Sequence, residues 1–153
     1  MTTTPTDARV PARGTPSASR ATIRLHRAPA AVLPIGACGP VDDLGRLVHA
    51  DDPAAQLALA LARVEAIVTA AGLAPTDLAQ LRVMATDLPA VLGVLDTLTE
   101  RLAELGADPA LSVIGVTALP LPGMLVALDG LAIGTPAPAG ATQARISERD
   151  RDS

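Results

Sequence analysis

The chain has 153 residues, a length typical of a single domain, and 49% of its residues are hydrophobic although it contains no Phe, Tyr or Trp. It also contains no Lys, so all twelve of its basic residues are arginines, and its net charge is −4. These absences exclude a Schiff-base lysine, a tyrosine acid and the stacking of nucleic-acid bases on aromatic rings.

The charge distribution and the single cysteine limit the partners further. Residues 22–133 carry six arginines against twelve Asp and Glu residues, a net charge of −6, and so offer no basic face to nucleic acid. Cys38 has no partner for an internal disulfide, which fits a reducing compartment. No apolar run follows a basic start, and no apolar stretch approaches the ~18 residues of a bilayer span. We therefore expect a cytoplasmic protein without nucleic-acid or membrane partners.

The two ends of the chain differ in composition from its middle. Residues 1–20 are rich in Thr, Pro, Ser, Ala and Arg, and residues 134–153 contain prolines followed by a charged end, both without periodicity. Such segments cannot bury enough apolar surface to fold. The sequence predicts two disordered tails around one folded domain at 21–133.

The domain begins with strand-like segments. We expect strands at 22–26 and 31–38, and Pro34 argues that the second lies at a sheet edge or carries a bulge. Turn signals follow it, with a short third strand as an option at 46–48.

Two helices are predicted, each after an aspartate. Asp52 followed by Pro53 marks the start of the first helix, and Gly72 marks its end. A strand is expected at 81–86. The second helix then follows Thr86-Asp87-Leu88-Pro89, with its apolar stripe running from Val91 to Leu105 and its end at Gly106.

Two apolar segments close the domain. Residues 112–118 and 124–133 flank a Leu-Pro-Leu-Pro-Gly corner at 119–123, a hairpin-type signal. The element order β-β-(β)-α-β-α-β-β predicts a two-layer α+β domain with both helices on one sheet face. Because the last two strands are apolar on both sides, the other face is expected to pack against a partner.

The stretch from Pro109 to Ile133 resembles the signature of the RidA/YjgF family of small trimeric proteins. In that family the stretch reads roughly Pro-Ala-Arg-Ser, a hydrophobic strand, Leu-Pro, and a strand with alternating acidic residues. Matching residues here are Pro109, Ala110, Ser112, Leu119, Pro120 and Asp129, whereas Leu111 holds the arginine position and Ala127 the first acidic position. The resemblance extends over roughly 22–133.

The resemblance implies a RidA/chorismate-mutase-like fold assembling as a trimeric barrel, with a small-molecule site in a cleft between subunits. There the family's arginine binds a substrate carboxylate and its glutamate positions water for imine or enamine hydrolysis. Leu111 cannot bind a carboxylate, and Ala127 cannot position water. The resemblance also places Ile35-Gly36-Ala37 at a cleft-lining strand end. The expected ligand-binding residues are Gly36, Cys38, Leu111, Ser112 and Ala127.

Other residues are weaker candidates for chemistry. Cys38 is a candidate nucleophile if His26 or His49 lies beside it, and otherwise a small buried hydrophobe. Asp129 shares a sheet face with Ala127 and is a candidate acid, or else a carboxylate at a subunit rim or paired with an arginine. Arg82, on an adjacent predicted strand, is a candidate displaced cation, or else a solvated or ion-paired arginine. No spacing of His, Cys, Asp and Glu indicates a metal site, and no motif indicates a cofactor.

The sequence thus leads to one favoured hypothesis and two alternatives. The favoured one is a RidA-like homotrimer that binds a small, uncharged or hydrophobic molecule and has lost the family's 2-imino acid deaminase activity. The first alternative is an enzyme of altered chemistry that uses Cys38 or Asp129. The second is a structural subunit that pairs with itself or with a paralogue.

Overall fold

The computed structural model describes residues 31–137. The predicted tail at 1–20, the predicted strand at 22–26 and the part of the C-terminal tail after residue 137 lie outside the described residues. The elements are, in chain order, β1 (Ala31–Cys38), α1 (Pro53–Ala70), the 3₁₀ turn η1 (Pro75–Asp77), β2 (Leu78–Ala85), α2 (Leu88–Leu92), α3 (Leu95–Glu104), β3 (Ala110–Gly115) and β4 (Val126–Gly134).

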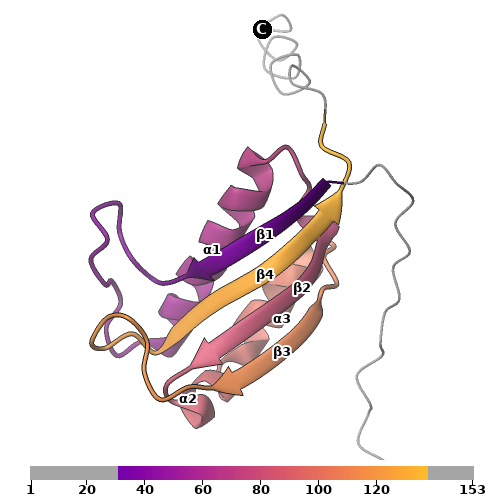
Figure 1. The fold of residues 1–153 in the computed structure, drawn as a ribbon. Helices are drawn as coiled ribbons and strands as arrows, with labels where there is room; N and C mark the ends of the chain where they lie inside the picture. The colour runs from indigo at the N-terminus through magenta and orange to yellow at the C-terminus, as the bar shows by residue number, and fades with distance from the viewer. Residues whose placement is uncertain (1–30, 138–153) are drawn as a thin grey trace, which may run out of the picture.

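The described residues form two layers, a sheet and a helical layer (Figure 1). The sheet has four strands in the order β1-β4-β2-β3, and the helices all lie behind one of its faces. β4 runs antiparallel to both β1 and β2, whereas β3 runs parallel to β2. This confirms the predicted α+β class with the helices on a single face.

The expectation of a hairpin around the Pro/Gly corner is wrong. β3 and β4 flank that corner in the chain, but β2 lies between them in the sheet. The segment 116–125 therefore crosses the end of β2 instead of making a tight turn. β2, the helices and β3 form a parallel crossover unit, which places β3 at the outer edge.

The position of β1 agrees with the proline in it. Among residues 31–137, β1 is the other edge strand, and its pairing with β4 shifts register between Ile35 and Cys38, where a bulge follows Pro34. The optional third strand at 46–48 is reduced to a single bridge between Val41 and Leu47.

Helix α1 has the start and end that its sequence predicts. Asp52 accepts a hydrogen bond from the Ala55 backbone N–H at 2.9 Å, Pro53 is the first helical residue, and Gly72 adopts a φ of 75° after the last turn. With 18 residues of mean hydropathy 1.3, α1 is long and apolar enough for a membrane span, which corrects the expectation that no stretch reaches that length. Its buried side, however, packs on the sheet, as expected of a core helix.

The second predicted helix is two helices. α2 ends at Leu92, α3 begins at Leu95, and Gly93 and Val94 form a turn between them. Glycine has a low helix propensity, and the backbone of Val94 lies outside the helical region with φ −123° and ψ 14°. Asp87 caps α2, and Gly106 follows α3 with a φ of 66°, as expected.

The core lies between the helices and the inner sheet face. Its fully buried side chains alternate along the strands, with Leu81, Val83 and Ala85 on β2, and recur along α1. The other buried members of the core include Leu57, Ala60, Leu61, Val64, Val68, Val91, Leu98, Val126, Leu128 and Ala132. No aromatic ring contributes, so the core is filled by Leu, Val, Ile and Ala.

Candidate functional site

The sheet face opposite the helices carries no covering element among residues 31–137 (Figure 1). Strand register places Val32, Leu131 and Ile133 on this face near the β1 edge, and Met84 and Ile114 toward the β3 edge. Val32 is 59% exposed and Ile114 is 39% exposed. We call this surface the open face. Its apolar side chains are those from which the sequence predicted an interface.

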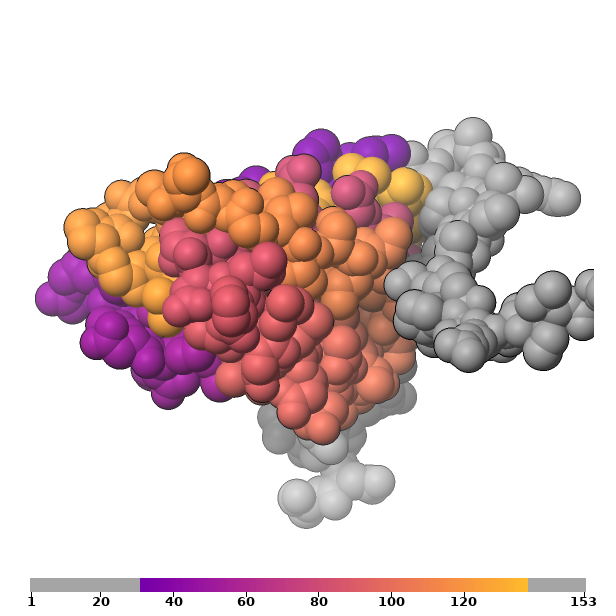
Figure 2. Space-filling model, turned by 90° about the horizontal axis from the view of Figure 1, so that it is seen from below, coloured from indigo at the N-terminus to yellow at the C-terminus, as the bar shows by residue number. Residues whose placement is uncertain are grey.

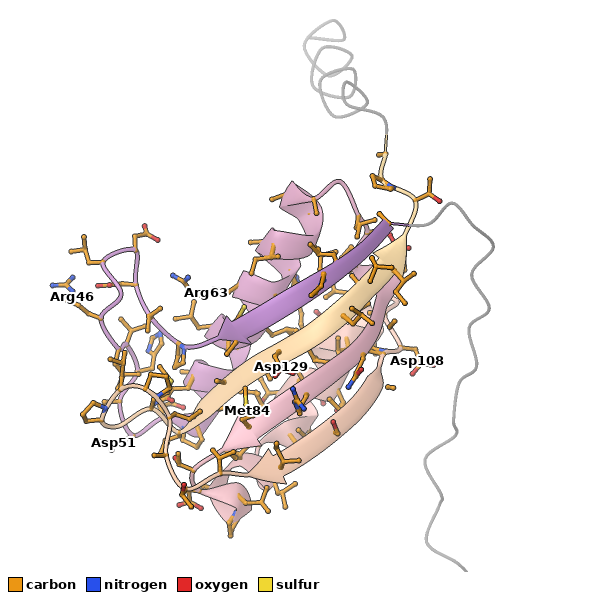
Figure 3. All side chains as sticks on the ribbon, viewed as in Figure 1. Arg46, Asp51, Arg63, Met84, Asp108 and Asp129 are labelled. Carbon is orange, nitrogen blue, oxygen red and sulfur yellow. The ribbon has the colours of Figure 1, made fainter. Side chains whose placement is uncertain are left out.

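One row of polar residues crosses the open face. Register aligns Ser112, Arg82 and Asp129 on β3, β2 and β4. Arg82 donates to both carboxylate oxygens of Asp129, from Nε at 3.0 Å to Oδ1 and from Nη2 at 2.6 Å to Oδ2. This pairing raises the pKa of the Arg82 guanidinium. Asp129 is thus engaged with a cation, and Figure 3 shows it near Met84 in the middle of this face.

The two positions at which the sequence analysis expected a departure from the family pattern differ in placement. Leu111 pairs with Leu81, turns to the helix-covered side, and packs partly buried against the core. Ala127 lies opposite Met84 on the open face and is only 2% exposed. Ser112, next to Leu111, is exposed on the open face. Neither Leu111 nor Ala127 supplies a polar atom to a ligand.

Four of the five predicted ligand-binding residues lie at opposite edges of the sheet, and the fifth, Ala127, lies on β4 between them. Gly36 and Cys38 are on β1, Leu111 and Ser112 are on β3, and β4 and β2 separate them. Three strand spacings amount to roughly 14 Å. One protomer therefore does not bring these residues into one cleft.

Cys38 is a buried thiol to which no base is hydrogen-bonded among residues 31–137. It is 7% exposed, and its Sγ lies 3.4 Å from the Gly36 carbonyl oxygen, to which it donates a weak hydrogen bond. Burial raises the pKa of the thiol, and the positive charge of Arg63 opposes that shift in part. No hydrogen bond joins Cys38 to His49, and His26 lies outside the described residues. At neutral pH Cys38 is protonated.

Two neighbouring hollows lie between α1, the end of β1 and the loop that follows it. The first, about 430 Å³, is lined by Gly36, Ala37, Cys38, Gly39, Val41, Arg63, Ala66 and Ile67. The second, about 530 Å³, is lined by Val41, Asp42, Asp43, Val48, Leu59, Ala62, Arg63 and Ala66. Because they share Val41, Arg63 and Ala66, we treat them as one groove, the α1–β1 groove.

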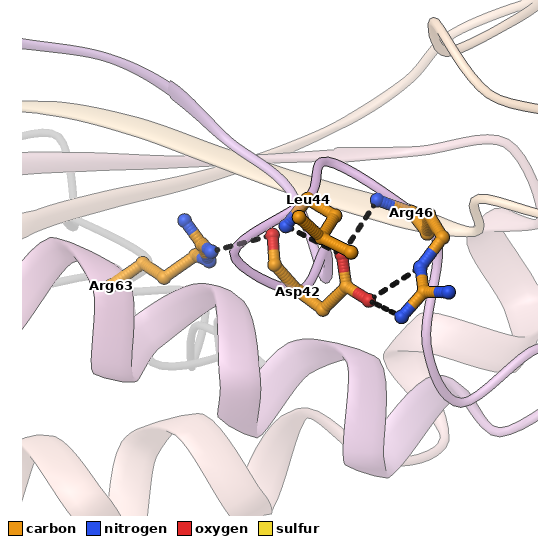
Figure 4. A network of polar contacts seen from close by, with 4 residues as sticks. All are labelled: Asp42, Leu44, Arg46 and Arg63. Atoms are coloured by element: carbon orange, nitrogen blue, oxygen red, sulfur yellow. Dashed lines mark hydrogen bonds and ion pairs between the residues drawn. The ribbon is translucent and has the colours of Figure 1, made fainter.

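Arg63 is the cation of this groove, and sequence reasoning did not select it. Figure 3 shows it projecting from α1 toward the loop, and Figure 4 shows its guanidinium beside Asp42. Nε donates to the Val41 carbonyl at 3.0 Å and Nη2 to the Asp42 carbonyl at 3.3 Å. The Asp42 carboxylate faces the other way, where Arg46 pairs with it at 2.7 Å and helps hold its pKa low. In the sequence, Arg63 stands out only as a lone arginine that lies outside the apolar stripe of α1.

Gln56 is a second residue that the sequence did not single out. It is fully buried near the start of α1. Its Nε2 donates to the carbonyls of His49 and Gly123, each at 3.0 Å, and its Oε1 accepts from the Leu125 N–H at 2.8 Å. One side chain therefore joins the loop before α1 to the loop before β4, which lie side by side in Figure 2. In the sequence, the only indication of this role is that Gln56 places an amide in a mainly apolar helix.

The described part of the chain has no group of three or more His, Cys, Asp and Glu residues placed to hold a metal ion. The polar side chains described on the open face are Ser112 and the Arg82–Asp129 pair, and those that line the α1–β1 groove are Arg63, Asp42 and Asp43.

Comparison with known proteins places this arrangement in context. The family model described as endoribonuclease L-PSP matches residues 31–133. Among solved structures, the Rid family protein YyfB from Yersinia pestis, described as of unknown function, is 33% identical, with a TM-score of 0.59 over 66% of this chain and 77% of that one.

Two structures from E. coli are similar to the same degree. The YjgF gene product is 30% identical, with a TM-score of 0.60 over 67% of this chain and 80% of that one. TdcF, solved with bound serine, is 26% identical, with a TM-score of 0.61 over 68% and 81% of the two chains. No curated protein matches the chain. The family match covers the whole sheet and helical layer from β1 into β4, and so the chain belongs to the endoribonuclease L-PSP family, which is the RidA/YjgF family.

Proposed function

We infer that the chain acts as a RidA-like homotrimer that binds a small, uncharged or hydrophobic molecule in clefts between its subunits, without 2-imino acid deaminase activity. The observation that carries this proposal is the pair Leu111 and Ala127. The first packs against the core and the second is 2% exposed, so neither position offers a guanidinium or a carboxylate. General acid–base assistance alone contributes roughly 10²- to 10⁴-fold to such a reaction.

The open face supports an assembly of several copies. It exposes Val32 and Ile114 in a sheet that has no second covering layer in residues 31–137. Burying this face leaves no charge unpaired, because Arg82 and Asp129 neutralise each other. A surface with paired charges and apolar surroundings suits a contact between subunits.

The spread of the expected ligand-binding residues also favours a shared site. Gly36 and Cys38 lie at one edge of the sheet, and Leu111 and Ser112 at the other. A cleft containing both groups requires the β1 edge of one copy to approach the β3 edge of another. The site is then incomplete in a single protomer, which makes the assembly part of the binding function.

The cleft is expected to disfavour a free amino acid. TdcF was solved with bound serine, a ligand with a carboxylate. Here the side chain at the corresponding arginine position is Leu111, which would leave a carboxylate in the cleft unpaired. Cys38, with its raised pKa, gives no support to the alternative of a nucleophilic enzyme.

Native mass spectrometry of the full chain, freshly purified under gentle conditions, tests both parts of the proposal. We expect a homotrimer that carries an added small-molecule mass, released on denaturation and neutral or apolar when identified. A monomer would contradict the assembly. A trimer without added mass that also fails to bind apolar probes would contradict ligand binding.

A separate assay tests the loss of deaminase activity. A 2-imino acid generated in situ should hydrolyse at the same rate with the protein as in buffer alone. A rate enhancement of several orders of magnitude would show that other residues perform the chemistry. E. coli YjgF provides a family member for comparison in the same assay.

A further inference from the structure

We propose that the α1–β1 groove binds a small monocarboxylate with an apolar aliphatic body, which Arg63 holds through the carboxylate. Every residue of this groove belongs to one protomer. The proposal therefore stands apart from the cleft between subunits, although Gly36 and Cys38 border both.

The geometry of Arg63 leaves half of its guanidinium available. A guanidinium has five N–H donors in a planar arrangement. Nε and one Nη2 proton form its lateral edge, and these donate to the carbonyls of Val41 and Asp42. The remaining edge, formed by Nη1 and the second Nη2 proton, has no hydrogen-bond partner among residues 31–137. Two parallel N–H groups of this kind match the two oxygens of a carboxylate.

Arg63 also forms no ion pair among residues 31–137, although its charge acts at longer range on the carboxylate of Asp42. Four arginines lie in the described part of the chain, and three of them form ion pairs there, Arg46 with Asp42, Arg82 with Asp129, and Arg101 with Glu65 and Glu104. Arg63 forms none within this part. It is half-buried and fixed at its lateral edge by backbone carbonyls, so a ligand need not pay the entropy of ordering it.

The groove around the guanidinium is otherwise mainly apolar. Ala37, Val41, Ala66 and Ile67 line the first hollow, and the protonated thiol of Cys38 adds a weakly polar wall. Leu59, Ala62 and Val48 line the second, together with Asp42, whose carboxylate is paired with Arg46, and Asp43. A volume of about 430 Å³ falls within the range of roughly 300–1,000 Å³ that is usual for small-molecule sites. An anion with an aliphatic body satisfies both the cation and its surroundings.

Isothermal titration of the purified chain with sodium hexanoate tests the proposal, with hexanamide as the neutral counterpart and acetate and sulfate as anions without an apolar body. We expect hexanoate to bind at least about tenfold more tightly than each of the three, because charge-assisted hydrogen bonds and apolar burial both contribute. Equal binding of acetate or sulfate would overturn the apolar part of the site. Hexanamide binding that is as tight as that of hexanoate and equally weakened by Arg63→Gln would overturn the role of the charge.

Matched variants locate the site. Arg63→Gln keeps a polar side chain but removes the charge, and should weaken hexanoate binding at least about tenfold. The control Arg101→Gln alters an arginine whose carboxylate partners, Glu65 and Glu104, do not line the groove, and it should leave the affinity unchanged. An unchanged affinity in a folded Arg63→Gln variant would overturn the proposal.

A second pair of variants tests the location of the site even if Arg63→Gln alters the loop at Val41 and Asp42, which the arginine contacts. Ala66→Leu fills the exposed wall shared by both hollows without touching Arg63, and should abolish binding. Ala103→Leu makes the same change on an exposed site of α3 and should not. Retained binding in Ala66→Leu would overturn the groove as the location.

Cys38 provides an independent readout, since it is the only thiol of the chain. Saturating hexanoate should slow its alkylation by iodoacetamide severalfold, and Arg63→Gln should remove this protection, whereas any protection by hexanamide in the cleft between subunits should be the same in the variant. Alkylation at the same rate with and without saturating hexanoate would place any bound hexanoate elsewhere.

Discussion

Gln56 shows how one buried amide can hold two loops. Its three hydrogen bonds join α1 to the backbone at His49, Gly123 and Leu125. Both loops are otherwise irregular, and His49 and Asp51 adopt positive φ values of 58° and 64° in the first of them. The amide therefore supports a backbone conformation that these residues would not adopt freely.

Replacement of Gln56 by Leu should destabilise the fold strongly. The change conserves volume but leaves the Leu125 N–H and two carbonyls without partners, each costing about 1–3 kcal/mol when buried. We expect a loss of about 2–5 kcal/mol in the free energy of unfolding, measured by urea denaturation. Thr69→Ala, at an exposed site of the same helix, serves as the control. A midpoint within error of the unchanged chain would show that water replaces the amide.

Cys38 should make stability depend on alkaline pH. Burial raises the pKa of its thiol above the value of about 8.5 for an unfolded chain. The folded state therefore favours the protonated thiol, and this contribution is fully present below pH ~8.5 and is lost as pH rises through the folded pKa. The chain has no Lys and no Tyr, so only Cys38 and the α-amino group titrate between about pH 8 and 11.

The measurement is urea denaturation across this pH range for the unchanged chain and for Cys38→Ala. The unfolding free energy of the unchanged chain should fall as pH rises, and the curve of the variant should be flatter. Parallel curves would assign the alkaline loss to a group other than the thiol.

At the scale of elements, the sequence predicted the helix ends and the edge strand, which local residue preferences determine. It missed the features that depend on how the elements pack. The cap at Asp52, the helix end at Gly72 and the edge position of β1 follow from single residues with strong backbone preferences. The break at Gly93 was missed because the apolar stripe continues across it from Val91 to Leu95, and periodicity alone cannot detect a turn that preserves it.

The false hairpin has a related cause. A Pro/Gly corner between two apolar segments specifies a change of chain direction but not what lies between the segments. β2, formed earlier in the chain, occupies that place. The same reasoning applies to the site. Leu111 and Ala127 could be identified from a motif, whereas Arg63 acquires its significance only from the carbonyls of Val41 and Asp42, which the fold brings to it.

Gly93, in the break between α2 and α3, can be tested by substitution, with Gly106 after α3 as a glycine of the opposite backbone conformation. Gly93 lies in the right-handed helical region with φ −66°, and an added Cβ would come no closer than 3.4 Å to the Ala90 carbonyl oxygen. Gly93→Ala should therefore stabilise the chain by about 0.4–1 kcal/mol through the unfolded state. Gly106 has a φ of 66°, and Gly106→Ala should destabilise it by roughly 1 kcal/mol.

Thermal unfolding followed by circular dichroism measures both changes. The two variants should move the melting temperature in opposite directions. A lower melting temperature for Gly93→Ala would indicate that the turn between the helices requires glycine for a reason other than its φ.

At the scale of the whole molecule, the fold has one covered and one uncovered sheet face. Packing of the helices accounts for the core but leaves Val32, Met84, Ile114, Leu131 and Ile133 on the open face, with the Arg82–Asp129 pair among them. The α1–β1 groove lies on the other side of the β1 edge, beside the helical layer. Assembly through the open face would therefore leave the α1 side of that groove, with Arg63 and Ala66, accessible, whereas its β1 side borders the edge that the proposed cleft between subunits uses.

The substitution Ile114→Arg tests whether the open face is the assembly surface. It places a cation without a carboxylate partner among apolar side chains, and burying it between subunits would cost several kcal/mol. We expect light scattering coupled to size-exclusion chromatography to change from a trimer to a monomer, while far-ultraviolet circular dichroism stays the same. Leu44→Arg makes the equivalent change at a loop residue that is 78% exposed and should leave the mass unchanged.

The affinity for hexanoate should survive in the monomer, because every residue of the groove comes from one chain. A trimer that tolerates Ile114→Arg would move the contact away from this face, and a monomer that no longer binds hexanoate would show that the groove also depends on assembly.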